Sequence, residues 1–356
     1  NDIKLGASIS AGGGIVLNAK RHIDTTATTT SLNTSNNAVV INADSDANNT
    51  GTLWLGGLTV NPGSGNVVIR GNTITAETTY INGSGTLTVE SNGNSFSSDV
   101  QTSWFTPAAT LTGLSIGKST NTFDVYIDSA VSIAGPITLQ GGGIYVQQNL
   151  TTTNATTGNV RIETTGLTGT GNIALASGRG LTIDQSGNSS YQGSISGSSA
   201  TLTKSGAGGL SLLKASTYDG GTTLSGGILG LYQNSAAGTG TISLGTGTTL
   251  RLGRAVTEIA NNISLAGAAT VDFDTAIDYL IVGGGGGGGS ATPTSGTLSL
   301  TVGSGGAGGP AGSGGSAGGA SSLTIAGATV TASGGLGGQR AGDGGTSGAP
   351  QSNAGS

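Results

Sequence analysis

Apolar and polar residues alternate in many short stretches between residues 14 and 274. Period-two alternation predicts β-strands with one buried face, and the Asn, Gly, Ser and Asp clusters between the stretches favour turns. No long stretch shows the 3.6-residue period of an amphipathic helix. Clear examples of predicted strands are 14–19, 38–43, 52–60, 66–71, 86–91, 123–128 and 137–147.

Strands this short do not fold alone, but they can bury their apolar faces by stacking on similar units. Their starts are spaced irregularly up to residue 157 and more regularly afterwards. We therefore predict an all-β fold, a right-handed parallel β-helix (solenoid), which is irregular over 1–157 and regular over 158–277. The segment 96–123 interrupts the succession of predicted strands and is predicted as a loop excursion.

The composition supports strands over disorder, because only 8% of the 356 residues are charged while 34% are hydrophobic. The formal net charge is −5, and the 12 Lys and Arg residues are dispersed. Without a basic stripe, nucleic acid is an unfavourable partner, and no apolar stretch predicts membrane insertion. The chain has no Cys, so its stability does not come from disulfides.

The amino-acid composition changes at residue 278, where a glycine-rich segment begins and continues to residue 356. Its apolar residues are confined to two islands, 296–303 and 321–334. Ordering glycine is entropically costly, so we expect systematic backbone pairing, either as polyglycine-II-like helices or as short strands. We predict that Gly283–Ser356 is a packing module between copies of the protein; the alternative is that it packs along its own solenoid.

The segment Ala200–Leu231 reads ATLTKSGAGGLSLLKASTYDGGTTLSGGILGL. It resembles the passenger-associated transport repeat of bacterial autotransporters and related secreted adhesins. Two positions depart from that pattern: Gly209 stands where Thr is usual and Ser216 where Asn is usual. The phrases at 12–25 and 65–74 also resemble filamentous-haemagglutinin-type exoproteins, which form right-handed β-helices.

These resemblances imply a secreted bacterial cell-surface adhesin or a structural filament subunit, located extracellularly. Expected partners are further copies of the chain, a cell-surface or glycan ligand, and an outer-membrane translocation pore during export. The sequence begins at Asn1 without a leader, so we expect a mature processed protein or a fragment. The alternatives are a carbohydrate- or ice-binding solenoid and, as a third class, a polysaccharide hydrolase or lyase.

Candidate chemistry is sparse. The single histidine, His22, lacks a nucleophile elbow or an evident acid partner, and with no Cys it cannot complete a zinc ligand set. Asp44, Asp46 and Asn48 have the alternate spacing of a calcium loop, but Asn49 replaces the expected Gly. An Asn/Asp-rich turn without a metal explains the same residues, so the calcium loop and the turn both stay open as interpretations.

The other acidic cluster contains Asp272, Asp274 and Asp278. Paired carboxylates can hydrolyse a glycosidic bond, but no basic residue stands beside these three in the sequence. We therefore predict that the chain is not an enzyme, with no catalytic, cofactor-binding or metal-binding residues.

Two further features concern surfaces. Trp104, Phe105 and Pro107 form either a contact surface or aromatic packing under a corner of the solenoid. The Thr-rich runs 25–34 and 149–157 either present flat rows of hydroxyls to ice or carbohydrate, or are simply solvated strand surface.

Overall fold

The computed structural model divides the chain into two compact units, Asn1–Ala269 and Thr270–Ser356. Among the residues that it describes, the regular structure is β-strand apart from one short 3-10 helix, Thr102–Trp104. The described residues are 1–26, 29–48, 50–274, 279–281, 289–291, 297–301, 316–319, 321–325 and 328–332.

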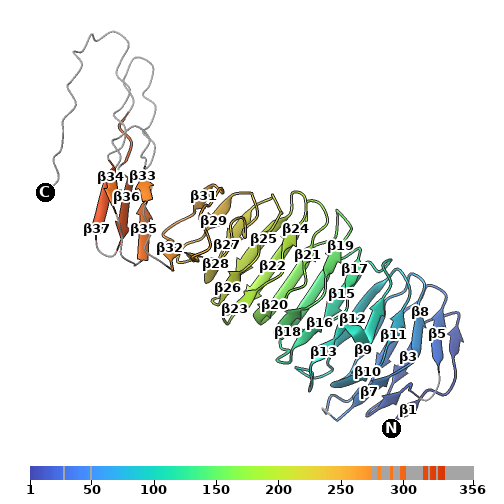
Figure 1. The fold of residues 1–356 in the computed structure, drawn as a ribbon. Helices are drawn as coiled ribbons and strands as arrows, with labels where there is room; N and C mark the ends of the chain where they lie inside the picture. Colours follow the sequence, from blue (N-terminus) through green and yellow to red (C-terminus); the bar gives the residue numbers. More distant parts are fainter. Residues whose placement is uncertain are drawn as a thin grey trace, which may run out of the picture. The chain divides into compact units, whose positions relative to one another are not determined.

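The first unit is a parallel β-solenoid of about 13 turns, which confirms the predicted all-β solenoid class. Its coils stack one on the next from β1 to β31 (Figure 1). One sheet, here called the main sheet, takes a strand from nearly every coil. Its path is β3 (Ile15–Asn18), β6 (Val39–Asn42), β9 (Val67–Arg70), β12 (Thr86–Glu90), β15 (Gly113–Ile116), β18 (Ile137–Val146), β20 (Val160–Thr168), β22 (Gly180–Gln185), β25 (Thr201–Ser205), β27 (Thr222–Leu224), β29 (Ile242–Leu244) and β31 (Ile263–Leu265).

Shorter parallel sheets form the other sides of the coils. Early coils contribute β1 (Ile3–Lys4), β4 (Ile23–Asp24), β7 (Thr52–Leu55) and β10 (Thr73–Ala76), and a second set β2 (Ile9–Ala11), β5 (Thr30–Thr34), β8 (Leu58–Asn61), β11 (Thr79–Ile81) and β14 (Phe105–Pro107). Later coils contribute β17 (Val131–Ile133), β19 (Leu150–Thr152), β21 (Ile173–Ala174) and β24 (Ile195–Ser196), and also β23 (Ser189–Tyr191), β26 (Gly209–Leu212), β28 (Ile228–Leu231) and β30 (Thr249–Leu252).

The core consists of in-register columns of inward side chains. Because alternate residues of a strand point to opposite faces, each predicted strand supplies one or two apolar residues to the interior. One column of the main sheet contains Leu17, Ile41, Ile69, Val89, Ile116, Leu139, Ile162, Ile183, Lys204, Leu224 and Leu244, all of them buried. Lys204 therefore occupies a position that is apolar in the other coils of this column.

Coil length changes along the solenoid. Register partners in the main sheet from Ile15 to Val160 lie between 20 and 28 residues apart. From Val160 to Ile263 they are 20 or 21 residues apart. The ladder continues from β18 to β20, so the main sheet is not interrupted where the coil length changes.

Part of the segment predicted as a loop excursion, 96–123, is paired into the stack. Its strand β13 (Val100–Gln101) pairs in parallel with β16 (Val125–Ile127), and β14 pairs with β11. Phe96 and Phe105 are each only 2% exposed. Burying two aromatic rings favours a longer coil over a projecting loop, so Phe105 follows the packing interpretation.

The described strands of the second unit are short and antiparallel. They are β32 (Thr270–Phe273), β35 (Thr297–Thr301), β36 (Ser321–Ile325) and β37 (Ala328–Ala332), with β33 (Tyr279–Ile281) paired to β34 (Gly289–Ala291). This part agrees with the short-strand alternative. The predicted start at residue 278 and the polyglycine-II-like alternative fall on residues outside those described, as does most of the proposed packing module Gly283–Ser356.

Candidate functional site

A cleft of about 590 Å³ lies on the first unit, across four successive coils. Its volume is within the range of small-molecule and saccharide sites. One wall comes from the segment between β15 and β16, and the opposite wall from β20 and β22. The lining residues are Ser119, Thr120, Asn121, Thr122, Asp124, Gly141, Gly142, Glu163, Thr164, Thr165, Asp184 and Ser186.

Glycines of β18 form the floor of the cleft and allow the first wall to approach closely. The Gly142 N–H donates to the Phe123 carbonyl at 2.9 Å. A Cβ on Gly142 would lie 2.3 Å from the Thr122 carbonyl oxygen, a contact that real side chains do not make. The GGG sequence of this strand is therefore required to hold residues 119–124 against the coil that follows.

Two of the three cleft carboxylates are held by protein groups. The Asp124 Oδ1 atom accepts a hydrogen bond from the Gly143 N–H at 2.6 Å. Glu163 accepts hydrogen bonds from the Gln140 amide and the Arg161 guanidinium. Burial opposes ionisation of Glu163, but these two partners outweigh it and lower the pKa of its carboxyl.

Asp184 differs from these two, because no hydrogen bond to its carboxylate occurs within the described part of the chain. Its register partner Glu163, on the preceding coil, carries a like charge. On the next coil it is attracted by the ammonium of Lys204. That ammonium donates instead to the carbonyls of Ser205 at 2.6 Å and Gly206 at 3.1 Å. The Asp184 oxygens are therefore attracted by a buried cation while keeping their acceptor capacity for a ligand.

An aromatic pair stands beside the same wall. The rings of Tyr126 and Tyr145 are stacked, with centroids 4.5 Å apart and planes inclined by 9°. They are register partners on adjacent coils. The charge of Asp124 raises the pKa of Tyr145, so its phenol is a neutral hydrogen-bonding group next to the cleft at physiological pH.

The cleft thus combines hydroxyls, an amide and carboxylates on a rigid backbone. Such groups bind a polyhydroxylated ligand through several hydrogen bonds, and those to a carboxylate are the strongest. Among the described residues, no group of three or more His, Cys, Asp or Glu side chains is arranged to hold a metal ion. The cleft is consequently a candidate site for an organic polar ligand.

The structure places His22 at the first coils, far along the sequence from any cleft residue. Its Nδ1 accepts the Thr52 N–H at 3.2 Å, and its ring lies 4.8 Å from that of Trp54 at a 41° tilt. These contacts join two coils, which is a structural role.

The predicted calcium loop forms a self-bonded turn in the described residues. Asp44 is fully buried, and its Oδ1 accepts the Asn48 N–H at 3.1 Å. The Asn48 amide donates to Asp46 at 3.2 Å. The Asn48 Oδ1 accepts the Thr50 N–H at 3.0 Å, which is the bond of an Asx turn; Asn49 is outside the described residues.

The acidic cluster of the sequence does not contribute to the cleft. Asp272 lies in β32 and Asp274 follows it, both in the second unit, while Asp278 is outside the described residues. The cleft carboxylates come from residues 124–184, which the sequence interpretation did not single out. These carboxylates share one feature, an outward polar position near the GGG sequence of β18. This feature can be recognised only when the register of the coils is known.

Each of the two Thr-rich runs is divided between the core and the surface in the described residues. Thr25 and Thr30 of the first run are inward and at most 1% exposed, and Thr152 of the second is 3% exposed. Alternation along a strand necessarily turns every second residue of such a run towards the core.

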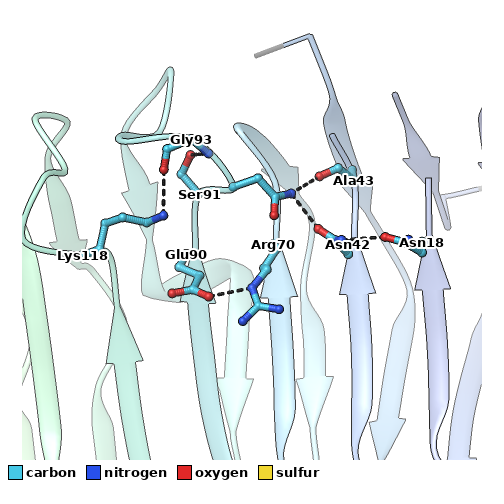
Figure 2. A network of polar contacts seen from close by, with 9 residues as sticks. Asn18, Asn42, Ala43, Arg70, Glu90, Ser91, Gly93 and Lys118 are labelled. Carbon is cyan, nitrogen blue, oxygen red and sulfur yellow. Dashed lines mark hydrogen bonds and ion pairs between the residues drawn. The ribbon is translucent and has the colours of Figure 1, made fainter. Parts of the chain in front are cut away.

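A second polar cluster lies on the outer face of the early coils (Figure 2). The Asn42 amide donates to Asn18 at 2.6 Å, and Asn92 donates to Asn42 at 2.6 Å. Arg70 pairs with Glu90 at 2.6 Å, as Figure 2 also shows. Because these groups satisfy one another between coils, we interpret the cluster as structural cross-linking.

Comparison of the chain with protein-family models, with curated proteins and with solved structures finds no match. The resemblance of Ala200–Leu231 to a transport repeat therefore rests on its own residues. The described residues contain no helix of the length and apolar character needed to cross a membrane.

Proposed function

We propose that this chain is the solenoid part of a secreted bacterial surface adhesin and that it binds carbohydrate in the lateral cleft. The observation that carries the proposal is the cleft itself, in which Asp184 keeps open acceptor oxygens among the hydroxyls of Ser119, Thr165 and Ser186. The adjacent coils hold these groups in place before any ligand arrives.

Sugar hydroxyls suit such a site because each can donate to a carboxylate and accept from a hydroxyl or amide. A rigid parallel ladder spares the ligand the cost of ordering the protein, so moderate hydrogen bonds suffice for recognition. The cleft volume of about 590 Å³ leaves room for a sugar ring between the two walls.

The adhesin role draws on the stacked architecture and on the motif at Ala200–Leu231. A solenoid of many coils can display a binding site at a distance from its attachment point, and several copies add avidity. Under this proposal the chain is extracellular, passes an outer-membrane pore during export and associates with other copies. It binds its glycan without cleaving it.

A glycan array probed with the full chain tests the proposal, followed by calorimetry on the strongest glycan. Asp184→Asn should weaken that binding about tenfold or more, because a hydrogen bond to a charged group contributes about 1.5–3 kcal/mol. The matched control is Glu77→Gln, an exposed carboxylate outside the cleft, which should bind normally. Binding that is undetectable for the parent chain, or equal for parent and Asp184→Asn, contradicts the proposal. A shortened glycan after incubation contradicts its non-enzymatic part.

A further inference from the structure

The outer face of the main sheet loses its charges in the last four coils, β25 to β31. Earlier coils carry Arg70, Glu90 and Arg161 at outward positions of this sheet. The later coils carry hydroxyl, amide or small residues there. This surface, here called the hydroxyl face, consists of Thr201, Thr203, Ser205, Thr223, Ser225, Thr241, Ser243, Gly245, Asn262, Ser264 and Ala266.

Register gives the hydroxyl face a two-dimensional order. Thr203, Thr223, Ser243 and Ser264 are direct partners in one column. Neighbouring strands lie about 4.8 Å apart, and alternate residues along a strand are roughly 6.7 Å apart. Since these coils are all 20 or 21 residues long, the grid continues across the face without an insertion.

The threonines of the hydroxyl face have little rotational freedom. Threonine is β-branched and has few accessible χ1 rotamers on a strand, so its hydroxyl and methyl groups keep a fixed relation to the sheet. Thr201, Thr223, Thr241 and Ser264 are exposed, so that these hydroxyls meet solvent directly.

Hydrogen-bond geometry indicates what such a grid matches. Water oxygens joined by a hydrogen bond lie about 2.75 Å apart. In a tetrahedral network, two waters bonded to the same third water are then about 4.5 Å apart. This separation is close to the strand spacing, so waters held by successive hydroxyls of a column can share bridging waters, as in an ordered lattice.

We propose that the hydroxyl face binds ice. The face lacks the aromatic and charged groups with which proteins usually hold sugars, and those groups occur instead at the cleft. Uncharged hydroxyls and methyls leave interfacial water free to adopt the geometry of the lattice, whereas Lys or Glu would orient it around a charge. The activity is independent of glycan binding at Asp184.

Thermal hysteresis and inhibition of ice recrystallisation, measured on the full chain with serum albumin as reference, test the proposal. The parent chain should hold ice crystals without growth below their melting point and should keep crystals small. The double variant Thr203→Lys with Thr223→Lys places two charges at the centre of the grid and should abolish both effects. Ser190→Lys, an exposed position of β23 on another sheet, should retain them.

Circular dichroism and the melting temperature establish that each variant is folded. If the lysine variant does not fold, Thr223→Ala, which only truncates an exposed side chain, should still reduce thermal hysteresis at least twofold. Parent activity no greater than albumin overturns the proposal, and so does full activity in a folded Thr203→Lys, Thr223→Lys protein. Selective binding to insoluble cellulose through the same residues would assign the face to a polysaccharide instead and would equally overturn it.

Discussion

The coils before Val160 and those after it have the same interior but different exteriors. In both regions, buried aliphatic side chains stack in register, as Leu87 and Leu210 illustrate. The early coils vary in length and are joined outside by pairs such as Arg70–Glu90 and Asn18–Asn42. The later coils are nearly equal in length, and from β25 onward the outside of their main sheet bears hydroxyls and no charged side chain.

This difference separates what the fold requires from what it permits. An exposed ion pair contributes at most about 1 kcal/mol, so the outer cross-links of the early coils are small beside the burial of their cores. Equal coil length is likewise unnecessary for stacking. The nearly equal length of the coils after Val160 is therefore better explained by the ordered outer surface that it produces than by a requirement of stability.

The largest expected effect tests the shared interior. Leu87→Asp and Leu210→Asp each bury an unpaired carboxylate among stacked side chains that are at most 1% exposed. Each should cost at least about 4 kcal/mol of unfolding free energy, and the two costs should be alike. Denaturant unfolding followed by circular dichroism measures both.

The outward neighbours Thr88→Asp and Ser211→Asp serve as controls and should change stability by less than about 0.5 kcal/mol. A cost confined to one of the two leucines would show that the regions do not share one kind of core.

An intermediate effect concerns the corners of the regular coils. Gly206 and Gly247 have the same φ of +76°, but only Gly206 is crowded: a Cβ there would lie 2.3 Å from the Gln185 carbonyl oxygen. Gly247→Ala should cost about 1–2 kcal/mol for the left-handed conformation alone. Gly206→Ala should exceed about 3 kcal/mol, because backbone must also move. Equal melting temperatures for the two variants would mean that close approach at the corner does not set the coil spacing.

The smallest expected effect concerns Lys204. Burial lowers the pKa of its ammonium, partly offset by Asp184. Below the folded pKa the charged side chain carries its full desolvation cost, and the cost disappears as pH rises towards the ordinary value of the unfolded chain. The stability of the parent should therefore rise, relative to Lys204→Met, across the alkaline range below pH 10.5.

At pH 7, Lys204→Met should change stability by about 1–2 kcal/mol, since it removes a buried charge but leaves the Ser205 and Gly206 carbonyls without a donor. Denaturant midpoints of both proteins over a pH series give the comparison. A constant difference between them would refute the titration of Lys204 in this range.

Strand positions were accessible from the sequence because alternation is a local property. GIVLNA and NVVIRG contain β3 and β9, and the Leu-x-Leu of the predicted repeat, Leu210–Leu212, lies inward in β26. The pairing of the aromatic segment could not be read from the sequence, because the partner strands of β13 and β14 lie more than twenty residues away.

The cleft could not be predicted, since its residues come from four coils and none forms a motif alone. Asp124, Glu163 and Asp184 become neighbours of one cavity only through the register of β18, β20 and β22. The hydroxyl rows were sought in runs of consecutive Thr, whereas a column requires one Thr per coil, as at Thr203 and Thr223.

The constant length of the last coils also bears on how such a chain can evolve. Removing residues 222–241 would join Gly221 to Ile242, and the side chains of β29 and β31 would take the places of their register partners. Duplicating the same stretch would add one coil without disturbing the others. Unequal recombination in a gene of this kind can thus change the surface in whole-coil steps, while an insertion of any other length must be absorbed at a corner.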